Sequence, residues 1–212
     1  MYTFPRMRYS RWHSFSKTEV KELLVSWLAL SFCFAFTRQL SSFIILFPIS
    51  LLVVGAAFVV HELSHKLVAQ RFGLMASYRM WSWGILLALL TAILTELIGR
   101  KIIFAAPGAV YIFYPIAPFY LDYERVREAE IKISIAGPLS NIIMAFLFFF
   151  ISQLGGWFFL LGYIGFQVNA FLAFFNLLPF PPMDGWKIFR GNIVLWVILF
   201  LISIVTMTYL GV

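Results

Sequence analysis

The sequence predicts an all-α integral membrane protein, folded as a polytopic helical bundle, and two observations support this. Of its 212 residues, 62% are hydrophobic and only 12% are charged, about half the charged share of a soluble domain. Several apolar runs also approach the ~20 residues that a helix needs to cross a bilayer. These runs cover residues 20–37, 43–72, 133–153, 157–178 and 191–210. We therefore expect one membrane domain over residues 1–212.

The first run is flanked by a basic and aromatic segment, residues 1–22. This composition is typical of a segment that lies on a membrane surface, although a solvated tail fits it equally well. The run ends at Phe36-Thr37-Arg38 without a small-residue cleavage site, so we expect a retained anchor rather than a removed signal peptide. The single cysteine excludes an intrachain disulfide and a multi-cysteine metal site.

Two further apolar runs, 83–98 and 102–120, are ambiguous, and the placement of charge favours one topology for them. The net charge is +7, but the basic residues lie at the ends of apolar runs, which indicates membrane topology rather than nucleic-acid binding. If the N-terminus is cytoplasmic and 83–120 enters and leaves on one side, only Arg38, Arg100 and Lys101 of the 16 basic residues fall elsewhere. We therefore predict a multi-pass cell-membrane protein with a hairpin or re-entrant insertion at 83–120.

The run 43–72 contains the motif His61-Glu62-Leu63-Ser64-His65. Residues four apart lie on one face of a helix, so both imidazoles can reach a single metal. Glu62 can contact a metal-bound water without occupying a coordination position, and a carboxylate there can accept the proton of that water. The motif recurs by chance in soluble proteins, but ionisable groups at membrane depth are expensive and usually functional. The pattern therefore predicts a metal site.

A second polar group follows the run 157–178. A catalytic zinc usually takes three protein ligands, and two histidines leave it one short. Prolines at 179, 181 and 182 break the helix, and unwound backbone at membrane depth is tolerated only inside protein or beside a wet cavity. This places Asp184, followed by Gly185, inside the bundle as the candidate third ligand; a solvated aspartate after a proline-terminated helix is the simpler alternative.

These segments together resemble the site-2 protease family of intramembrane zinc metalloproteases. His-Glu-Leu-Ser-His at 61–65 and Asn176-Leu-Leu-Pro with Asp184-Gly185 match two of its motifs. Gly137-Pro138-Leu139-Ser140-Asn141 resembles the family's G-P-x-x-N, which opens the middle core helix. Pro107-Gly108-Ala109-Val110 is similar to the Pro/Gly-rich stretch that follows the first core helix. The resemblance covers about residues 55–190.

The resemblance implies a zinc metalloendopeptidase that hydrolyses peptide bonds in or near transmembrane segments of membrane proteins, as in regulated intramembrane proteolysis. It implies one Zn²⁺ per chain held by His61, His65 and Asp184, with Glu62 as the catalytic base. Asn176 and Asn141 are expected to bind substrate or orient the site. The expected partners are transmembrane protein substrates and the lipid bilayer, with no nucleic acid, and the oligomeric state is left open.

The family's three-helix catalytic core corresponds to residues 43–72, 133–153 and 157–185. Around it we expect a cytoplasmic or interfacial N-terminus at 1–22, the insertion at 83–120 after the first core helix, and a C-terminal span at 191–210. The chain departs from the family in the stretch 74–101, which is longer and more apolar than usual. It also shows no PDZ or CBS module, so the mode of substrate admission is left open.

A metal transporter or metal-sensing membrane protein is the main alternative. Transport has no need for a base beside a ligand, whereas Glu62 directly follows His61. A transport path also usually offers polar groups at several depths, and this chain concentrates them at one. A catalytically inactive scaffold is a third reading, which the intact set of His61, Glu62, His65 and Asp184 disfavours. The sequence therefore favours an enzyme.

Overall fold

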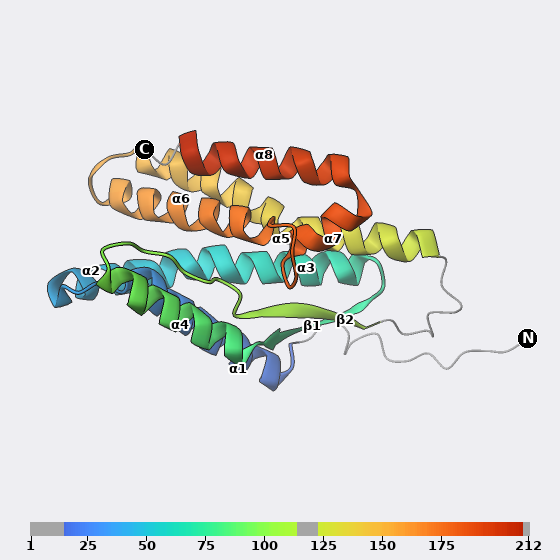
Figure 1. Ribbon diagram of the computed structural model, residues 1–212, viewed down its shortest axis with the longest axis horizontal. Coiled ribbons are helices and arrows are strands. Elements are labelled where there is room, and N and C mark those ends of the chain that lie inside the picture. The colour runs from blue at the N-terminus through green and yellow to red at the C-terminus, as the bar shows by residue number, and fades with distance from the viewer. Residues whose placement is uncertain (1–14, 114–122, 210–212) are drawn as a thin grey trace, which may run out of the picture.

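The computed structural model describes residues 15–113 and 123–209, and the chain is mostly helical (Figure 1). Three continuous helices in this part are long and apolar enough to cross a membrane, and they cover Leu40–Arg71, Glu124–Ser152 and Gly156–Asn176. The helices Ser82–Leu97 and Ile193–Thr208 are apolar but shorter. The chain is therefore a multi-pass membrane protein. Its elements are α1 Lys17–Ala35, α2 Leu40–Val54, the π-helical turn η2 Gly55–Val59, α3 Val60–Arg71, β1 Met75–Met80, α4 Ser82–Leu97, β2 Gly108–Phe113, α5 Tyr123–Ser152, α6 Gly156–Asn176, α7 Asp184–Gly191 and α8 Ile193–Tyr209.

The helices form layers on both sides of the continuous rod α2–η2–α3 (Figure 1). Helices α5, α6 and α8 lie on one side of the rod, while α1, α4 and the small sheet lie on the other. The close pairing of α5 with α6 depends on small residues. A Cβ added at Gly162 would lie 2.3 Å from the backbone nitrogen of Ser152. This packing holds α5 and α6 together beside the rod.

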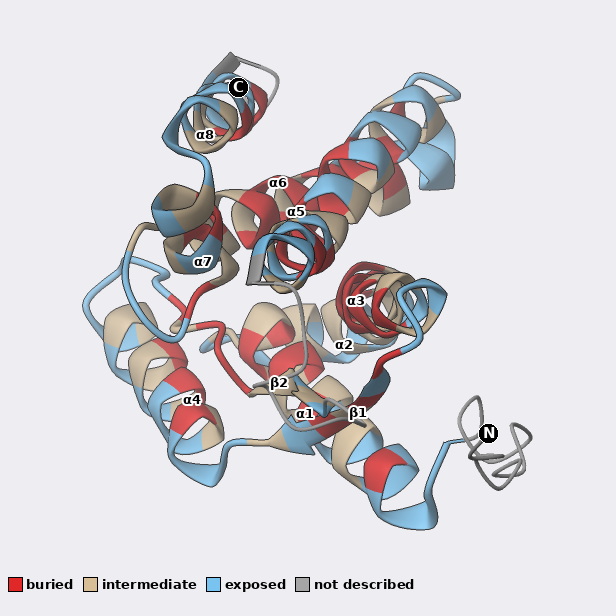
Figure 2. Cartoon of the chain, turned by 90° about the vertical axis from the view of Figure 1, so that its right-hand side faces the viewer, coloured by how far each residue is buried: buried red, intermediate tan, exposed pale blue. Residues whose placement is uncertain are grey.

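A two-stranded antiparallel sheet corrects the all-α prediction. Strand β1 pairs with β2, and Tyr78 lies opposite Val110 in the register. The two strands are separated by helix α4 and a long return segment. Because each short strand is stabilised by a partner about thirty residues away, local helical periodicity does not reveal it. The sheet lies beside α3, where it covers one face of the rod (Figure 2).

Helix α4 and residues 98–107 form an excursion that returns to its starting end (Figure 1). The return segment is extended, and side chains of α4 satisfy part of its backbone. Thr95 Oγ1 accepts the N–H of Ile102 at 2.9 Å, and Thr91 Oγ1 accepts the N–H of Phe104 at 3.0 Å. These bonds matter because exposed backbone groups are costly in lipid. The part of the 102–120 run beyond residue 113 lies outside the described residues.

Helix α5 is longer than the sequence predicts. The prediction places the second core helix at 133–153 and opens it at the Gly137-Pro138 motif, whereas α5 begins at Tyr123 and carries Pro138 inside it. The added turns are solvated but supported: Lys132 pairs with Glu128 one turn away. Ala129 in the same turns is buried in a cluster with Ala69 of α3. A charged segment can therefore continue a membrane helix beyond its apolar run.

Candidate metal centre

His61 and His65 lie one turn apart on α3, as the motif predicts, and both are almost completely buried. Their rings are 4.7 Å apart, and their Nε2 atoms approach to 3.0 Å. The helix reaches them directly after the π-helical turn η2. Such turns are rare and frequently occur at functional sites. The local helix therefore brings the two imidazoles to a common point.

Hydrogen bonds at the Nδ1 atoms determine which nitrogen of each imidazole is free to bind a metal. His65 Nδ1 donates to the carbonyl oxygen of Ile133 at 2.7 Å. His61 Nδ1 lies 2.6 Å from Asn141 Oδ1. The amide nitrogen of Asn141 already donates elsewhere, so its oxygen faces His61 and His61 Nδ1 must be the donor. With both Nδ1 atoms protonated, both Nε2 atoms present lone pairs, which is the tautomer that binds a metal.

Asn141 belongs to a buried amide chain that links three helices. Its Nδ2 donates to the carbonyl of Ala57 in η2 and to Oδ1 of Asn169 in α6, each at 3.0 Å. Asn169 Nδ2 in turn donates to the carbonyl of Gly165 at 2.8 Å. Both asparagines are fully buried. The sequence reading named Asn141 but missed Asn169, because one asparagine in an apolar run carries no signal of its partner 28 positions away.

Asp184 is brought to the histidines by the proline-rich segment. This segment contains a cis Pro181–Pro182 bond, and Asp184 begins α7 directly after the buried Met183. A Cβ at Gly185 would lie 2.2 Å from the carbonyl oxygen of Leu177, so only glycine allows α7 to pack this closely. Asp184 Oδ2 lies 3.0 Å from His65 Nε2 and 3.4 Å from His61 Nε2.

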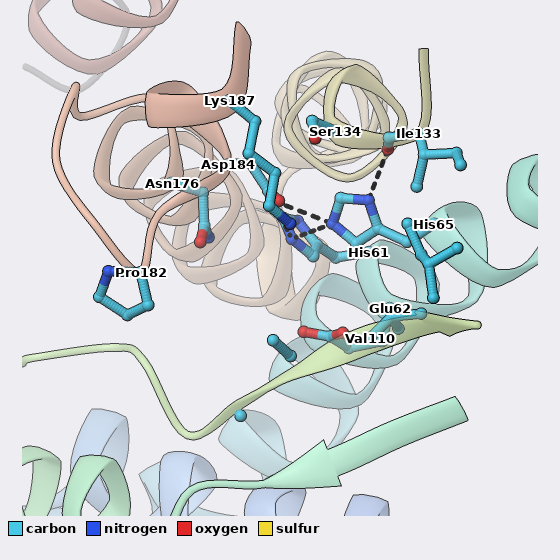
Figure 3. Close-up of a pocket in the computed structure, with 13 residues that line it drawn as sticks. His61, Glu62, His65, Val110, Ile133, Ser134, Asn176, Pro182, Asp184 and Lys187 are labelled. Atoms are coloured by element: carbon cyan, nitrogen blue, oxygen red, sulfur yellow. Dashed lines mark hydrogen bonds and ion pairs between the residues drawn. The ribbon is translucent and has the colours of Figure 1, made fainter. Parts of the chain in front are cut away.

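The three converging atoms fit a zinc ion (Figure 3). The ligand atoms of a tetrahedral zinc with bonds of about 2.0–2.1 Å lie about 3.3–3.4 Å apart, and the observed separations are 3.0, 3.0 and 3.4 Å. Two imidazoles and one carboxylate are also a donor set that zinc accepts, and they leave a fourth position for water. His61, His65 and Asp184 could therefore hold a metal.

Gly137 on α5 is required by the same geometry. A Cβ at this position would lie 2.3 Å from His65 Nε2 and 2.5 Å from His61 Nε2. The neighbouring Pro138 removes the N–H that would otherwise bond the carbonyl of Ser134, and the adjacent carbonyl, that of Ile133, is the one that accepts from His65. The Gly-Pro pair thus brings α5 against the imidazoles and loosens its hydrogen bonding there.

Glu62 is buried, with 7% of its surface exposed, and its Oε2 has no hydrogen-bond partner. A buried carboxylate oxygen without a partner is costly, and such groups in native structures call for an explanation. Glu62 lines two small cavities, of about 40 and 30 Å³, together with His61, Asn176 and Pro182. Figure 3 shows its carboxylate beside β2, near Val110.

The remaining predicted residue, Asn176, also faces this space from the end of α6. It lines both cavities, and its Nδ2 donates to the carbonyl of Leu172 at 2.9 Å. The larger cavity is completed by Lys187 of α7 and by Gly108, Ala109, Val110 and Ile112 of β2. The structure therefore brings all six predicted site residues into one region. The sequence prediction did not assign Lys187 to the site, and it noted residues 107–110 as a Pro/Gly-rich stretch without predicting a strand that lines the cavity.

Comparison with known proteins agrees with this geometry. The chain is 39% identical over 199 residues to the protein named "Putative zinc metalloprotease MJ0611" of Methanocaldococcus jannaschii, which covers 92% of this chain and 96% of that protein. It belongs to the site-2 protease family of zinc metalloproteases. This member of the family is a zinc metalloendopeptidase, and the histidines and Asp184 are its candidate metal ligands.

Two further relatives carry similar names. The chain is 31% identical over 155 residues to "Putative zinc metalloprotease YwhC" of Bacillus subtilis, covering 68% of each chain. It is 28% identical over 140 residues to "Zinc metalloprotease MJ0392" of Methanocaldococcus jannaschii, covering 63% of this chain and 31% of that protein. No family model and no solved structure matches the chain.

Proposed function

We propose that this chain is an intramembrane zinc metalloprotease that hydrolyses peptide bonds in or near transmembrane segments of other membrane proteins. The observation that carries the proposal is the position of the candidate site. Its two histidines and Glu62 lie in a continuous helix of membrane-spanning length, Leu40–Arg71, and they are buried inside the bundle. A protease whose reactive groups lie there can act on substrates that share the bilayer.

In this proposal His61, His65 and Asp184 hold one zinc ion per chain, and Glu62 is the general base. Zinc, when bound, supplies Lewis acidity, which lowers the pKa of water and polarises a peptide carbonyl. The Glu62 carboxylate, which lines the cavity and whose Oε2 has no hydrogen-bond partner, removes a proton from the attacking water. Glu62 then returns that proton to the leaving amide nitrogen, which balances the hydrolysis.

Asn141 and Asn176 receive different supporting roles. Asn141 accepts from His61 Nδ1 and thereby orients the first ligand. Asn176 lines both cavities beside Glu62, so we assign it to substrate contact. The catalytic core of the membrane domain then comprises 43–72, 133–153 and 157–185, surrounded by the segment 1–22, the insertion 83–120 and the span 191–210.

The proposal includes an orientation in the membrane, with a cytoplasmic N-terminus and an insertion at 83–120 that enters and leaves on the same side. The supporting observation is charge: Arg125, Arg127 and Lys132 then face the cytoplasm with Lys187 and Arg190. We expect a cysteine at Glu128 to react with an impermeant thiol reagent from the cytoplasmic side only. A cysteine at Leu154 should react from outside only.

This labelling needs a Cys33→Ser background, because Cys33 is the single native cysteine. Both reporter positions are exposed in the structure, so neither should fail to react because of burial. Labelling of position 128 from outside would refute the proposed orientation and the hairpin.

The decisive experiment separates the two carboxylates by parallel measurements of zinc content and cleavage, with a panel of purified single-span membrane proteins as substrates. Glu62→Gln keeps the shape of the side chain and leaves the ligands intact. We expect zinc to stay bound while cleavage falls at least ~10²-fold, the usual scale for loss of a general base. Asp184→Asn replaces an anionic ligand by a neutral one, so zinc affinity and cleavage should fall together.

Metal transport is the competing function, and the same pair of variants tests it. If the chain is a metal transporter, Glu62→Gln should have almost no effect on its function, because Glu62 is not a ligand. The parent chain should then cleave none of the substrates. Addition of a zinc chelator provides the control for metal dependence. Normal cleavage by Glu62→Gln would refute the proposed mechanism whatever the result for Asp184→Asn.

A further inference from the structure

Helix α1 is joined to the edge of strand β1 by two carboxylates. Glu19 Oε1 accepts the backbone N–H of Tyr78 at 3.0 Å, and Glu22 Oε2 accepts that of Met80, also at 3.0 Å. Successive N–H groups on the same side of a strand are two residues apart, and residues 19 and 22 lie on one face of α1. The two glutamates therefore occupy the edge of β1 that β2 does not use.

Glu19 also connects this edge to the helix that carries the histidines. Lys66 Nζ donates to Glu19 Oε1 at 2.6 Å and to Oε2 at 2.7 Å. Both side chains are buried, with 2% of Glu19 and 3% of Lys66 exposed. Lys66 directly follows the candidate ligand His65 on α3. One carboxylate thus contacts α3 and β1 from a third element, α1.

The same carboxylate caps its own helix, so its position is firmly determined. Ser16 N donates to Glu19 Oε2 at 3.4 Å, and Glu19 N donates to Ser16 Oγ at 3.0 Å, which forms a capping box. Tyr78 adds a second link, because its hydroxyl hydrogen-bonds Ser26 Oγ of α1 at 2.8 Å. We call this group, Glu19, Glu22, Lys66 and Tyr78, the α1 clamp.

Strand β2 transmits the position of the clamp to the site. Its residues Gly108 to Val110 form part of the wall of the cavity that contains the histidines and Glu62. Tyr78 lies opposite Val110 in the sheet, and a Cβ at Gly108 would lie 2.3 Å from the hydroxyl of Tyr78. A displacement of β1 would therefore displace the cavity wall, and a misplacement of about 1 Å can cost ~10²-fold in rate.

We propose that Glu19 and Glu22 are positioning residues of the protease: through β1 they hold β2 at a defined distance from α3 and so define the cavity in which a substrate peptide meets Glu62. This inference rests on the proposed function. Neither glutamate touches the candidate ligands, and both act through the sheet. Lys66 fixes the position of α3 relative to Glu19 and so determines the same distance from the side of the helix.

Two double variants distinguish a positioning role of Glu19 from the effects of its charge and of its contribution to stability. Glu19→Leu/Lys66→Met replaces the buried ion pair by apolar groups, a change that is often neutral for stability, but it removes the acceptor for Tyr78 N–H. Glu19→Gln/Lys66→Met removes the same charges and keeps an acceptor oxygen. We expect both to retain one zinc per chain, whereas kcat/KM of the leucine variant falls about 10-fold below that of the glutamine variant.

Amide hydrogen exchange supplies a readout that does not depend on cleavage. In the leucine variant, exchange at Tyr78, Met80 and residues 108–113 should be faster than in the glutamine variant. Equal exchange in the two variants would overturn the proposal, as would equal kcat/KM. Parallel loss of zinc, thermal stability and activity in both variants would also overturn it, because the pair would then serve stability alone. A parent chain without cleavage activity would refute the proposed function, and the exchange measurement would still test the clamp.

Glu22 provides a second test if the double variants do not fold. Its side chain is 22% exposed, so Glu22→Leu removes the acceptor for Met80 N–H at a lower cost than a change at Glu19. We expect an approximately 3-fold loss of kcat/KM with full zinc content and rescue by Glu22→Gln. The matched control is Glu128→Ala/Lys132→Ala, which removes an exposed ion pair and should leave kcat/KM unchanged. Parent-like activity of Glu22→Leu with unchanged exchange at Met80 would overturn the role of this residue.

Discussion

His65 and Lys66 are neighbours on α3, yet they belong to opposite kinds of buried polar group. Around His65, two nitrogen lone pairs and a carboxylate oxygen converge, and nearby Glu62 Oε2 has no partner. Around Lys66, the ammonium group donates to both carboxylate oxygens of Glu19, and Glu19 also accepts two backbone N–H groups. The comparison teaches that burial of charge alone does not identify a reactive centre. Convergence of several acceptor atoms on one point does identify such a centre, because these atoms together suit a cation.

The largest expected effect contrasts these two neighbours. His65→Ala should remove most of the bound zinc and abolish cleavage, because the zinc loses one of its three protein ligands. Lys66→Met should leave Glu19 buried without its counter-charge and destabilise the chain by about 3–5 kcal/mol, yet the folded fraction should keep its zinc. Elemental analysis of both purified variants measures their zinc content, and denaturant unfolding measures their stability. Loss of zinc from folded Lys66→Met would break the distinction.

A second pair of variants compares two tightly packed glycines. Gly137→Ala places a methyl group 2.3 Å from His65 Nε2, so we expect zinc affinity to fall at least ~10-fold as the imidazoles are pushed aside. Gly162→Ala places one 2.3 Å from the backbone nitrogen of Ser152. That change should cost about 1–3 kcal/mol of stability and leave zinc affinity unaltered. Competitive titration with a zinc chelator compares them, and equal affinities would show that Gly137 only packs helices.

A third prediction concerns the amide chain behind His61. Asn141→Ala removes the acceptor of His61 Nδ1, and loss of such a partner typically costs 10–100-fold in metal affinity. Asn169→Ala is one bond further away, so its effect should be smaller, roughly threefold. The same titration measures both. If Asn169→Ala proved the more severe, the order of the chain from Asn169 through Asn141 to His61 would be wrong.

The smallest expected effect lies at the surface. Glu128 and Lys132 form an i,i+4 pair in which both side chains are more than half exposed. Glu128→Ala should change the free energy of unfolding by no more than about 0.5 kcal/mol. Denaturant unfolding beside Lys66→Met provides the contrast between an exposed and a buried pair. A change as large as that of Lys66→Met would indicate that these turns of α5 have a structural role that their exposure does not suggest.

Much of the candidate site could be predicted because its information is local. The spacing of His61 and His65 determines that both lie on one helical face, and the prolines before Asp184 indicate an unwound segment. Asn169, Gly137 and Glu19 could not be assigned in this way. Each acts through a partner on another element: Asn169 through Asn141, Gly137 through the imidazoles, and Glu19 through Lys66 and Tyr78.

The fold was predictable to a similar degree. The long apolar runs predict helices α2–α3, α5 and α6, which the structure confirms as candidate spans. The sheet was missed because each strand depends on pairing between residues about thirty positions apart. The start of α5 was misplaced because hydrophobicity marks the membrane-buried part of a helix, whereas ion pairs continue the helix into water.

The size of the cavities beside Glu62 has a consequence for turnover. Spaces of about 40 and 30 Å³ hold a few water molecules but no stretch of peptide, since one water needs at least ~10–15 Å³. We therefore expect cleavage to require a form of the chain in which this space is wider. If that form is a minor population, the apparent affinity for substrate is reduced by its fraction, and each ~1.4 kcal/mol needed for widening weakens binding about tenfold. Selectivity can then reside in the energy of widening as well as in contacts with the peptide.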